Sequence, residues 1–352
     1  MKIKMLSVFQ YSGITAKVRT MMGKMLTVDD YKAMIQKKTV QDVANYLKNN
    51  TYYNTVLDDI NENSIHRGQL EQILKTSLIE SYTKLFKFLR GDVKTYLKLI
   101  FLKYEIEELK MIVRVLHTEH NIQFAQNSLA FLRENDDIDI QKLLESKNIQ
   151  QLIENLKGSV YYNVLSPFVV NTEHLDLFSI EMTLDMYFFN LVWKQKEKLL
   201  SGEDQRIITQ SLGSETDVLN ILWIHRCKKY YNIPNEIIYS YIIPYRYRLT
   251  KSQIVKMVEA KTVEELEQIV GATCYAQIFG QNKGLLLEHD FNLYVFKIYK
   301  KILRYHPFSI ASIMAFIHLK EIEIRNLISI IEGIRYGLEP EQIKQYIVAE
   351  NL

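Results

Sequence analysis

Acidic residues recur in one pattern at three places along the chain, and this pattern is the strongest candidate for chemistry. An acid is followed three positions later by Asn or Glu and then by Leu or Ile, in Glu105/Glu108, Asp217/Asn220 and Glu323/Asn326. Paired carboxylates serve in acid–base catalysis and in di-metal sites. The metal-binding version uses Glu-x-x-His, however, and no copy has that histidine. We therefore interpret these positions as structural contacts between packed modules.

Other chemical signatures are missing from the sequence. It has no Gly-x-x-x-x-Gly-Lys-Ser/Thr or Gly-x-Gly-x-x-Gly loop for phosphates and no Gly-x-Ser-x-Gly nucleophile elbow. His117 and His120 have the i, i+3 spacing of half a metal site, but no cysteine or carboxylate cluster nearby completes it. The sequence thus predicts no catalytic residue, no cofactor and no metal ligand.

A second repeated motif predicts pairs of short helices. Three similar stretches begin at Lys38, Lys147 and Lys261, which are 109 and 114 residues apart. Each has a capping residue and, three positions later, an acid or amide, which is the spacing of a capping box: Thr39…Asp42, Asn148…Gln151 and Thr262…Glu265. The same device comes one helix earlier, in Thr27…Asp30, Asp136…Asp139 and Thr250…Gln253. Each stretch ends in a tyrosine that we expect to pack in the core: Tyr52, Tyr161 and Tyr275.

The two motifs share a period of about 110 residues, which predicts three copies of one helical module. The repeated acids are 112 and 106 residues apart, and no low-complexity linker separates the copies. We expect modules at 1–120, 121–233 and 234–352 that pack directly on one another. Arg114 and Arg226 follow the second polar position by six residues, whereas Glu332 takes that place in the third copy.

Composition favours an all-α protein. The 352 residues include 12 glycines and 5 prolines, too few for the many tight turns of a β sandwich or barrel. A formal net charge of +3 lacks the basic excess of a dedicated nucleic-acid binder. Two cysteines cannot form a disulfide framework and suit a reducing cytosol. The longest apolar run, from Ile313 to Ile317, is far shorter than the roughly 20 residues that span a bilayer, so we expect no integral membrane protein.

The order of these motifs resembles a known family. The stretches that carry the resemblance are Ala16–Arg19, Met25–Tyr31, Asn50–Tyr53, Lys320–Leu327 and Gly333–Leu338. Together they are similar to the C subunits of V/A-type (vacuolar/archaeal-type) rotary ATPases and ATP synthases, which correspond to the d subunits of eukaryotic vacuolar ATPases. Glu108 departs from the asparagine usual in that family, and Glu332 departs from the arginine of the other two copies.

The resemblance implies a funnel of three all-α modules related by pseudo-threefold symmetry. It implies a non-catalytic part of the central stalk, at the cytoplasmic face of a prokaryotic plasma membrane. There the protein would dock the central-shaft subunits onto the membrane rotor ring. It would thereby couple ATP hydrolysis or synthesis to H⁺ or Na⁺ transport, with no cofactor, small-molecule substrate or nucleic acid of its own.

Interfaces between proteins are rich in aromatic residues and arginine, so exposed residues of these types are the docking candidates. They are Arg19, Arg114, Arg226, Tyr245, Arg246, Tyr247 and Arg248. One alternative is an all-α scaffold for cytosolic partners without a membrane complex, although such solenoids usually repeat every 20–50 residues. The other is an all-α enzyme whose site is assembled from distant residues.

Overall fold

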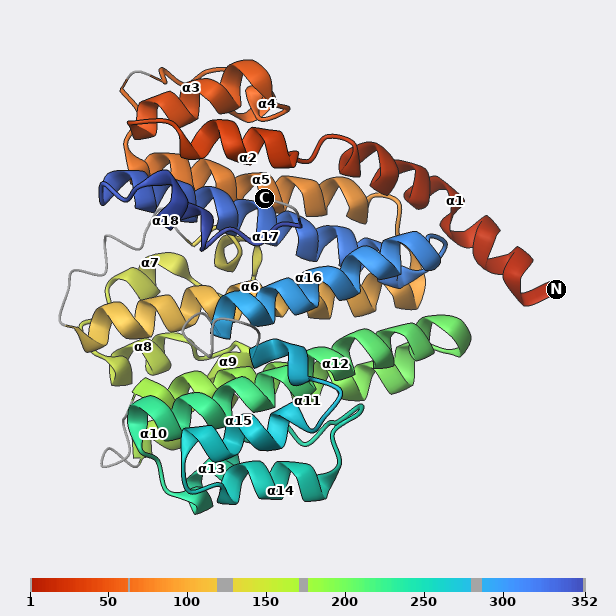
Figure 1. Ribbon diagram of the computed structural model, residues 1–352, viewed down its shortest axis with the longest axis vertical. Coiled ribbons are helices and arrows are strands. Elements are labelled where there is room, and N and C mark those ends of the chain that lie inside the picture. Colours follow the sequence, from red (N-terminus) through yellow and green to blue (C-terminus); the bar gives the residue numbers. More distant parts are fainter. Residues whose placement is uncertain (1, 63, 119–128, 171–176, 280–286, 351–352) are drawn as a thin grey trace. The chain divides into compact units, whose positions relative to one another are not determined.

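The chain folds into helices joined by turns. The computed structural model describes residues 2–62, 64–118, 129–170, 177–279 and 287–350, and these ranges contain helices but no strand (Figure 1). The all-α prediction is therefore confirmed. The chain divides into two compact units, residues 90–200 and residues 1–89 with 201–352.

The unit of residues 90–200 is built on two long helices that lie side by side. Helix α6 packs along much of α11, while α8 and α9 pack against this pair. Lys110 on α6 lies 2.9 Å from Asp185 on α11, and Arg114 makes a bidentate pair with Glu181 at 2.6 and 2.8 Å. The helices of this unit are α6 (Gly91–His117), the 3-10 turn η2 (Leu132–Glu134), α7 (Ile140–Leu144), α8 (Ile149–Asn155), α9 (Val160–Leu165), α10 (Pro167–Val170) and α11 (Leu177–Leu199).

The unit of residues 1–89 and 201–352 is centred on one long apolar helix, α17 (Ile310–Arg335). It contacts α16 along most of its length and also packs on α5, α1 and α12 (Figure 1). The N-terminal half of this unit contains α1 (Lys2–Met22), α2 (Val28–Ile35), α3 (Val40–Asn50), α4 (Asn54–Leu57) and α5 (Arg67–Phe86). The rest contains α12 (Gly202–Arg226), the π-turn η4 (Cys227–Tyr231), α13 (Asn235–Tyr241), α14 (Lys251–Glu259), α15 (Val263–Gly271), the 3-10 turn η5 (Ala276–Phe279), α16 (Leu287–Tyr305) and α18 (Pro340–Lys344).

Short helices begin where their caps predict, with one exception. The side chains of Thr27, Thr39, Asn148, Thr250 and Thr262 each accept from the backbone N–H three residues later. The predicted cap at Asp136 is wrong. Helix α7 is capped instead by Asp139, which accepts from the N–H groups of Gln141 and Lys142.

The reason for the late start lies in the residue before Asp136. Asn135 accepts from the N–H of Asp137 and donates to Glu105, so it holds this segment in a turn. Helix α7 therefore has 5 residues, whereas its counterparts α2 and α14 have 8 and 9.

Module boundaries at 1–120, 121–233 and 234–352 stay a prediction, and so does their pseudo-threefold arrangement. Residue 121 lies outside the described residues. Within the described ranges, no helix combines the length and apolar character that crossing a membrane requires.

Candidate functional site

Each repeated acid accepts a hydrogen bond from the hydroxyl of a repeated tyrosine. The acids lie on the long helices α6, α12 and α17, and all three tyrosine side chains are fully buried. The hydroxyl-to-carboxylate distances are 2.8 Å for Tyr161 and Glu105, 2.8 Å for Tyr275 and Asp217, and 2.9 Å for Tyr53 and Glu323. The two motifs found in the sequence thus form one structural site in three copies.

The acid–tyrosine pairs connect each copy of the motif to the next one along the chain, and the last copy to the first. Glu105 and Asp217 pair with tyrosines that follow them by 56 and 58 residues. Glu323, on the last long helix, pairs with Tyr53, which precedes it by 270 residues. Each long helix therefore supports the short-helix pair of the following copy, and the last supports the first.

In the first copy, the hydroxyl that contacts the acid belongs to Tyr53 and not to its neighbour Tyr52. A usable signal is a hydroxyl residue two positions before the tyrosine, at Thr51, Ser159 and Thr273. Thr51 and Thr273 accept from the N–H groups of Tyr53 and Tyr275 at 3.2 and 3.1 Å. Alignment on this residue shifts the first copy by one position and identifies Tyr53.

The second polar residue of each motif holds a returning backbone segment. Asn220 accepts from the N–H of Ile243 at 2.8 Å and donates to its carbonyl at 3.1 Å. Asn326 makes the same two bonds to Val348, at 2.8 and 3.0 Å. An asparagine side chain can do this because it carries both a donor and an acceptor.

Glu108 follows a modified version of this scheme. Its carboxylate has no donor when ionised, and it accepts from two consecutive N–H groups, those of Phe131 and Leu132. The shortest of these bonds is 2.8 Å. The departure from asparagine thus replaces a donor–acceptor pair with a double acceptor at the same place in the module.

In two of the three motifs, the first acid also fixes the approach to the short helices. Asp217, fully buried, accepts from the N–H groups of Tyr247, Arg248 and Leu249 at 3.1, 2.6 and 2.9 Å. Glu323 likewise accepts from the N–H of Leu26 at 2.6 Å. Leu249 and Leu26 directly precede the caps Thr250 and Thr27, so each of these two buried acids sets where a short helix begins.

The third copy adds a buried lysine. Lys320 is 1% exposed, and its Nζ lies 2.6 Å from Glu323 and 2.7 Å from the Tyr53 hydroxyl. It also bonds the hydroxyl of Tyr52. Burial lowers the pKa of the Lys320 ammonium, while the Glu323 carboxylate opposes that shift. The corresponding positions in the other copies are Leu102 and Ser214, so this ion pair distinguishes the third site.

The docking candidates differ in how free their side chains are. Arg114 is engaged with Glu181, and Arg226 forms an ion pair with Glu288. Arg19, in the last turn of α1, is exposed. The loop of residues 245–248 has a backbone held by Asp217; Tyr245 is half-buried there, while the other three side chains are exposed to solvent.

Catalytic geometry does not emerge from these groups. Among the described residues, no three histidine, cysteine or acidic side chains gather as a metal site would require. His120, half of the spacing noted in the sequence, lies outside those residues. His225 is buried, and burial together with Lys229 and Arg226 lowers its pKa to about 4, so its imidazole is neutral near pH 7.

We predict that Glu105→Gln changes the pH dependence of stability. Burial raises the pKa of the Glu105 carboxyl above its ordinary value, although the bonds from Asn135 and Tyr161 lower it in part. The folded state therefore holds this proton more tightly than the unfolded state, and the wild type loses stability as pH rises through that window. The stability of the wild type relative to the variant should thus fall from about pH 4.5 upward, as measured by urea unfolding across pH.

Glu62→Gln is a control for which we expect the pH dependence of stability to have the opposite sign. Hydrogen bonds from its own backbone N–H and from Lys48 lower the pKa of Glu62, so its contribution to stability is lost as pH falls. Parallel pH profiles for the wild type and Glu105→Gln would contradict the role assigned to Glu105.

We predict strong coupling between Lys320 and Glu323. Lys320→Met or Glu323→Gln alone leaves one charge buried without its partner and should cost about 3–5 kcal/mol of unfolding free energy. The double variant should cost clearly less than the sum of the two, because no unpaired charge remains. Additive losses in urea unfolding would exclude this coupling. As a control, Lys84→Met or Glu80→Gln breaks an exposed ion pair and should cost about 0–1 kcal/mol of unfolding free energy.

The chain is similar to known proteins over almost its whole length. Residues 14–346 match the family model described as ATP synthase (C/AC39) subunit. The C subunit of the A-type ATP synthase of Methanosphaera stadtmanae is 25% identical over 328 residues, covering 91% of this chain and 82% of the relative. Its counterpart from Archaeoglobus fulgidus is 23% identical over 336 residues, covering 95% of each. The chain belongs to the ATP synthase (C/AC39) subunit family.

Proposed function

We propose that this protein is a non-catalytic subunit of a V/A-type rotary ATPase or ATP synthase. The observation that carries the proposal is the match to the family model over residues 14–346, together with relatives named as C subunits of A-type ATP synthases. In this proposal the protein belongs to the central stalk at the cytoplasmic face of the membrane. It docks the central shaft onto the rotor ring and couples ATP turnover to H⁺ or Na⁺ transport.

The three carboxylate–tyrosine contacts support a mechanical role. A part that transmits torque must keep its helices in register under load. Each repeated acid ties a long helix to a short-helix pair through a tyrosine hydroxyl, and Asp217 alone accepts four hydrogen bonds. Breaking such a contact would leave several buried polar groups unpaired, at a cost of about 1–3 kcal/mol for each. The same device in three copies suits the three-module funnel that we propose.

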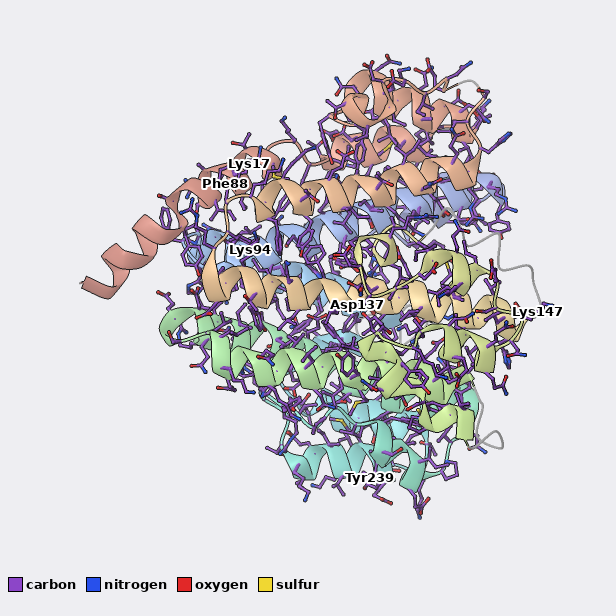
Figure 2. The ribbon with its side chains drawn as sticks, turned by 180° about the vertical axis from the view of Figure 1, so that it is seen from behind. Lys17, Phe88, Lys94, Asp137, Lys147 and Tyr239 are labelled. Atoms are coloured by element: carbon purple, nitrogen blue, oxygen red, sulfur yellow. The ribbon has the colours of Figure 1, made fainter. Side chains whose placement is uncertain are left out.

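A basic, aromatic stretch supports docking to acidic protein surfaces. Residues 226–256 contain seven basic residues and one acid, Glu236. We call this stretch the basic segment. Several of its aromatic rings reach solvent, with Tyr230 64%, Tyr231 60% and Tyr239 38% exposed. Figure 2 labels Tyr239. Exposed tyrosines have only two side-chain torsions and lose little entropy on binding, and arginine is enriched at protein interfaces, so both favour recognition of a partner.

Deletion of the protein tests the coupling role. We expect membranes without it to retain ATP hydrolysis by the catalytic head and to lose ATP-driven ion pumping, measured in the same preparation. Adding the purified protein back should restore pumping. Intact pumping in its absence would reject the proposal.

Charge reversal in the basic segment tests docking. Arg246→Glu/Arg248→Glu should weaken rebinding to depleted membranes roughly tenfold, because two favourable charges become repulsive. Thermal stability should stay close to wild type, since Asp217 binds only the backbone of this loop. The control Lys32→Glu/Lys87→Glu makes the same charge change at exposed sites elsewhere. Equal rebinding of both double variants would exclude the segment.

A further inference from the structure

A hollow lined by lysines lies in the unit of residues 1–89 and 201–352. Its volume is about 220 Å³, and ten residues from the first helices and α17 line it. Four of them are lysines, and none is acidic: the lysines are Lys17, Lys24, Lys84 and Lys320. Figure 2 labels Lys17 on α1. A concave site with one sign of charge raises the local concentration of ions of opposite charge.

Lys320, the cation of the buried ion pair described above, lines the hollow. Lys320 is 1% exposed and donates to the hydroxyl of Tyr52, which also lines the hollow. A hydroxyl that accepts from an ammonium becomes a better donor in turn. Burial and the nearby Glu323 raise the pKa of Tyr52, so it keeps its proton near neutral pH. Tyr52 therefore lines the hollow with a neutral hydroxyl rather than with a negative charge.

The hollow has an excess of positive charge, because two of its four lysines lack a carboxylate partner among the described residues. Lys320 is paired with Glu323, and Lys84 lies 3.1 Å from Glu80. In the described part of the chain, neither Lys17 nor Lys24 has a carboxylate within ion-pair distance. Burial and, to a smaller extent, the charge of Lys84 lower the pKa of Lys320, as expected of like charges held close together. An anion in the hollow would relieve this repulsion.

The remaining lining suits a compact phosphate group. Thr55 and Ser81 also line it, with hydroxyls that donate to the carbonyls of Tyr52 and Ser77, while Met21, Met25 and the buried Phe316 bring apolar walls. Apolar walls reduce the local dielectric constant and strengthen charge interactions. Lysine ammonium groups bind phosphate oxygens as point charges without demanding one planar geometry.

We propose that this hollow binds a multiply charged phosphate group, held by the ammonium groups of Lys17 and Lys24 and by the hydroxyl of Tyr52. The group can come from a soluble diphosphate or from the headgroup of an anionic lipid, because both present the same oxygens. This site lies on the chain itself, so it does not depend on the assembly proposed above.

The test uses the purified full chain at low salt with two probes. Inorganic pyrophosphate is titrated by calorimetry, and vesicles of phosphatidic acid in phosphatidylcholine, whose headgroup is a terminal phosphate, are tested by co-sedimentation. Lys17→Met/Lys24→Met removes the two unbalanced charges and leaves the buried pair intact. Lys32→Met/Lys87→Met removes two exposed lysines that do not line the hollow and serves as the control.

We expect at least one probe to bind, with affinity reduced roughly tenfold in Lys17→Met/Lys24→Met and unchanged in the control. Pyrophosphate binding of this kind assigns the site to a soluble phosphate, and vesicle binding of this kind assigns it to a lipid headgroup. Affinity should also fall as salt rises, because screening weakens exposed charges. Absence of binding to both probes, or equal loss in both double variants, would overturn the proposal.

Discussion

The enclosure of three carboxylates on long helices, two of them fully buried and Glu105 half-buried, is the constraint on which this structure depends. An ionised carboxylate in a protein interior is costly unless donors surround it. Here the donors come from other segments: a tyrosine hydroxyl in every copy, backbone N–H groups before a helix cap in two copies, and Asn135 beside Glu105. Each short-helix pair must therefore pack where its donors reach the acid. Helix starts, tyrosine positions and returning backbone segments all follow from this requirement.

The three copies supply hydrogen-bond donors to the repeated acid from different groups. Asp217 is short and collects three consecutive N–H groups, whereas Glu323 is longer and reaches a lysine on its own helix. Glu108 replaces asparagine and trades one donated bond for a second accepted one. What is preserved among the copies is a satisfied buried polar group, and the individual hydrogen bonds vary around it.

Much of the fold and part of the site can be predicted from the sequence. The caps at Thr27, Thr39 and Thr250 are predicted correctly because each bond joins residues only three positions apart. The cap predicted at Asp136 fails because Asn135 takes part in a contact with Glu105, 30 residues away, that local spacing cannot reveal. The gap-free alignment of the repeats points to Tyr52 instead of Tyr53, and within the sequence only Thr51, two positions earlier, marks Tyr53 as the equivalent residue.

The sequence by itself determined the helical class and the repeated motifs, because composition, capping and periodicity are local properties. Only the tertiary structure decided which acid meets which tyrosine, including the contact between Glu323 and Tyr53 across 270 residues. It also decided that Lys320 would be buried and that three other lysines would gather around a hollow beside it. These features depend on how distant helices pack, and packing depends on the shapes of all the surfaces that meet.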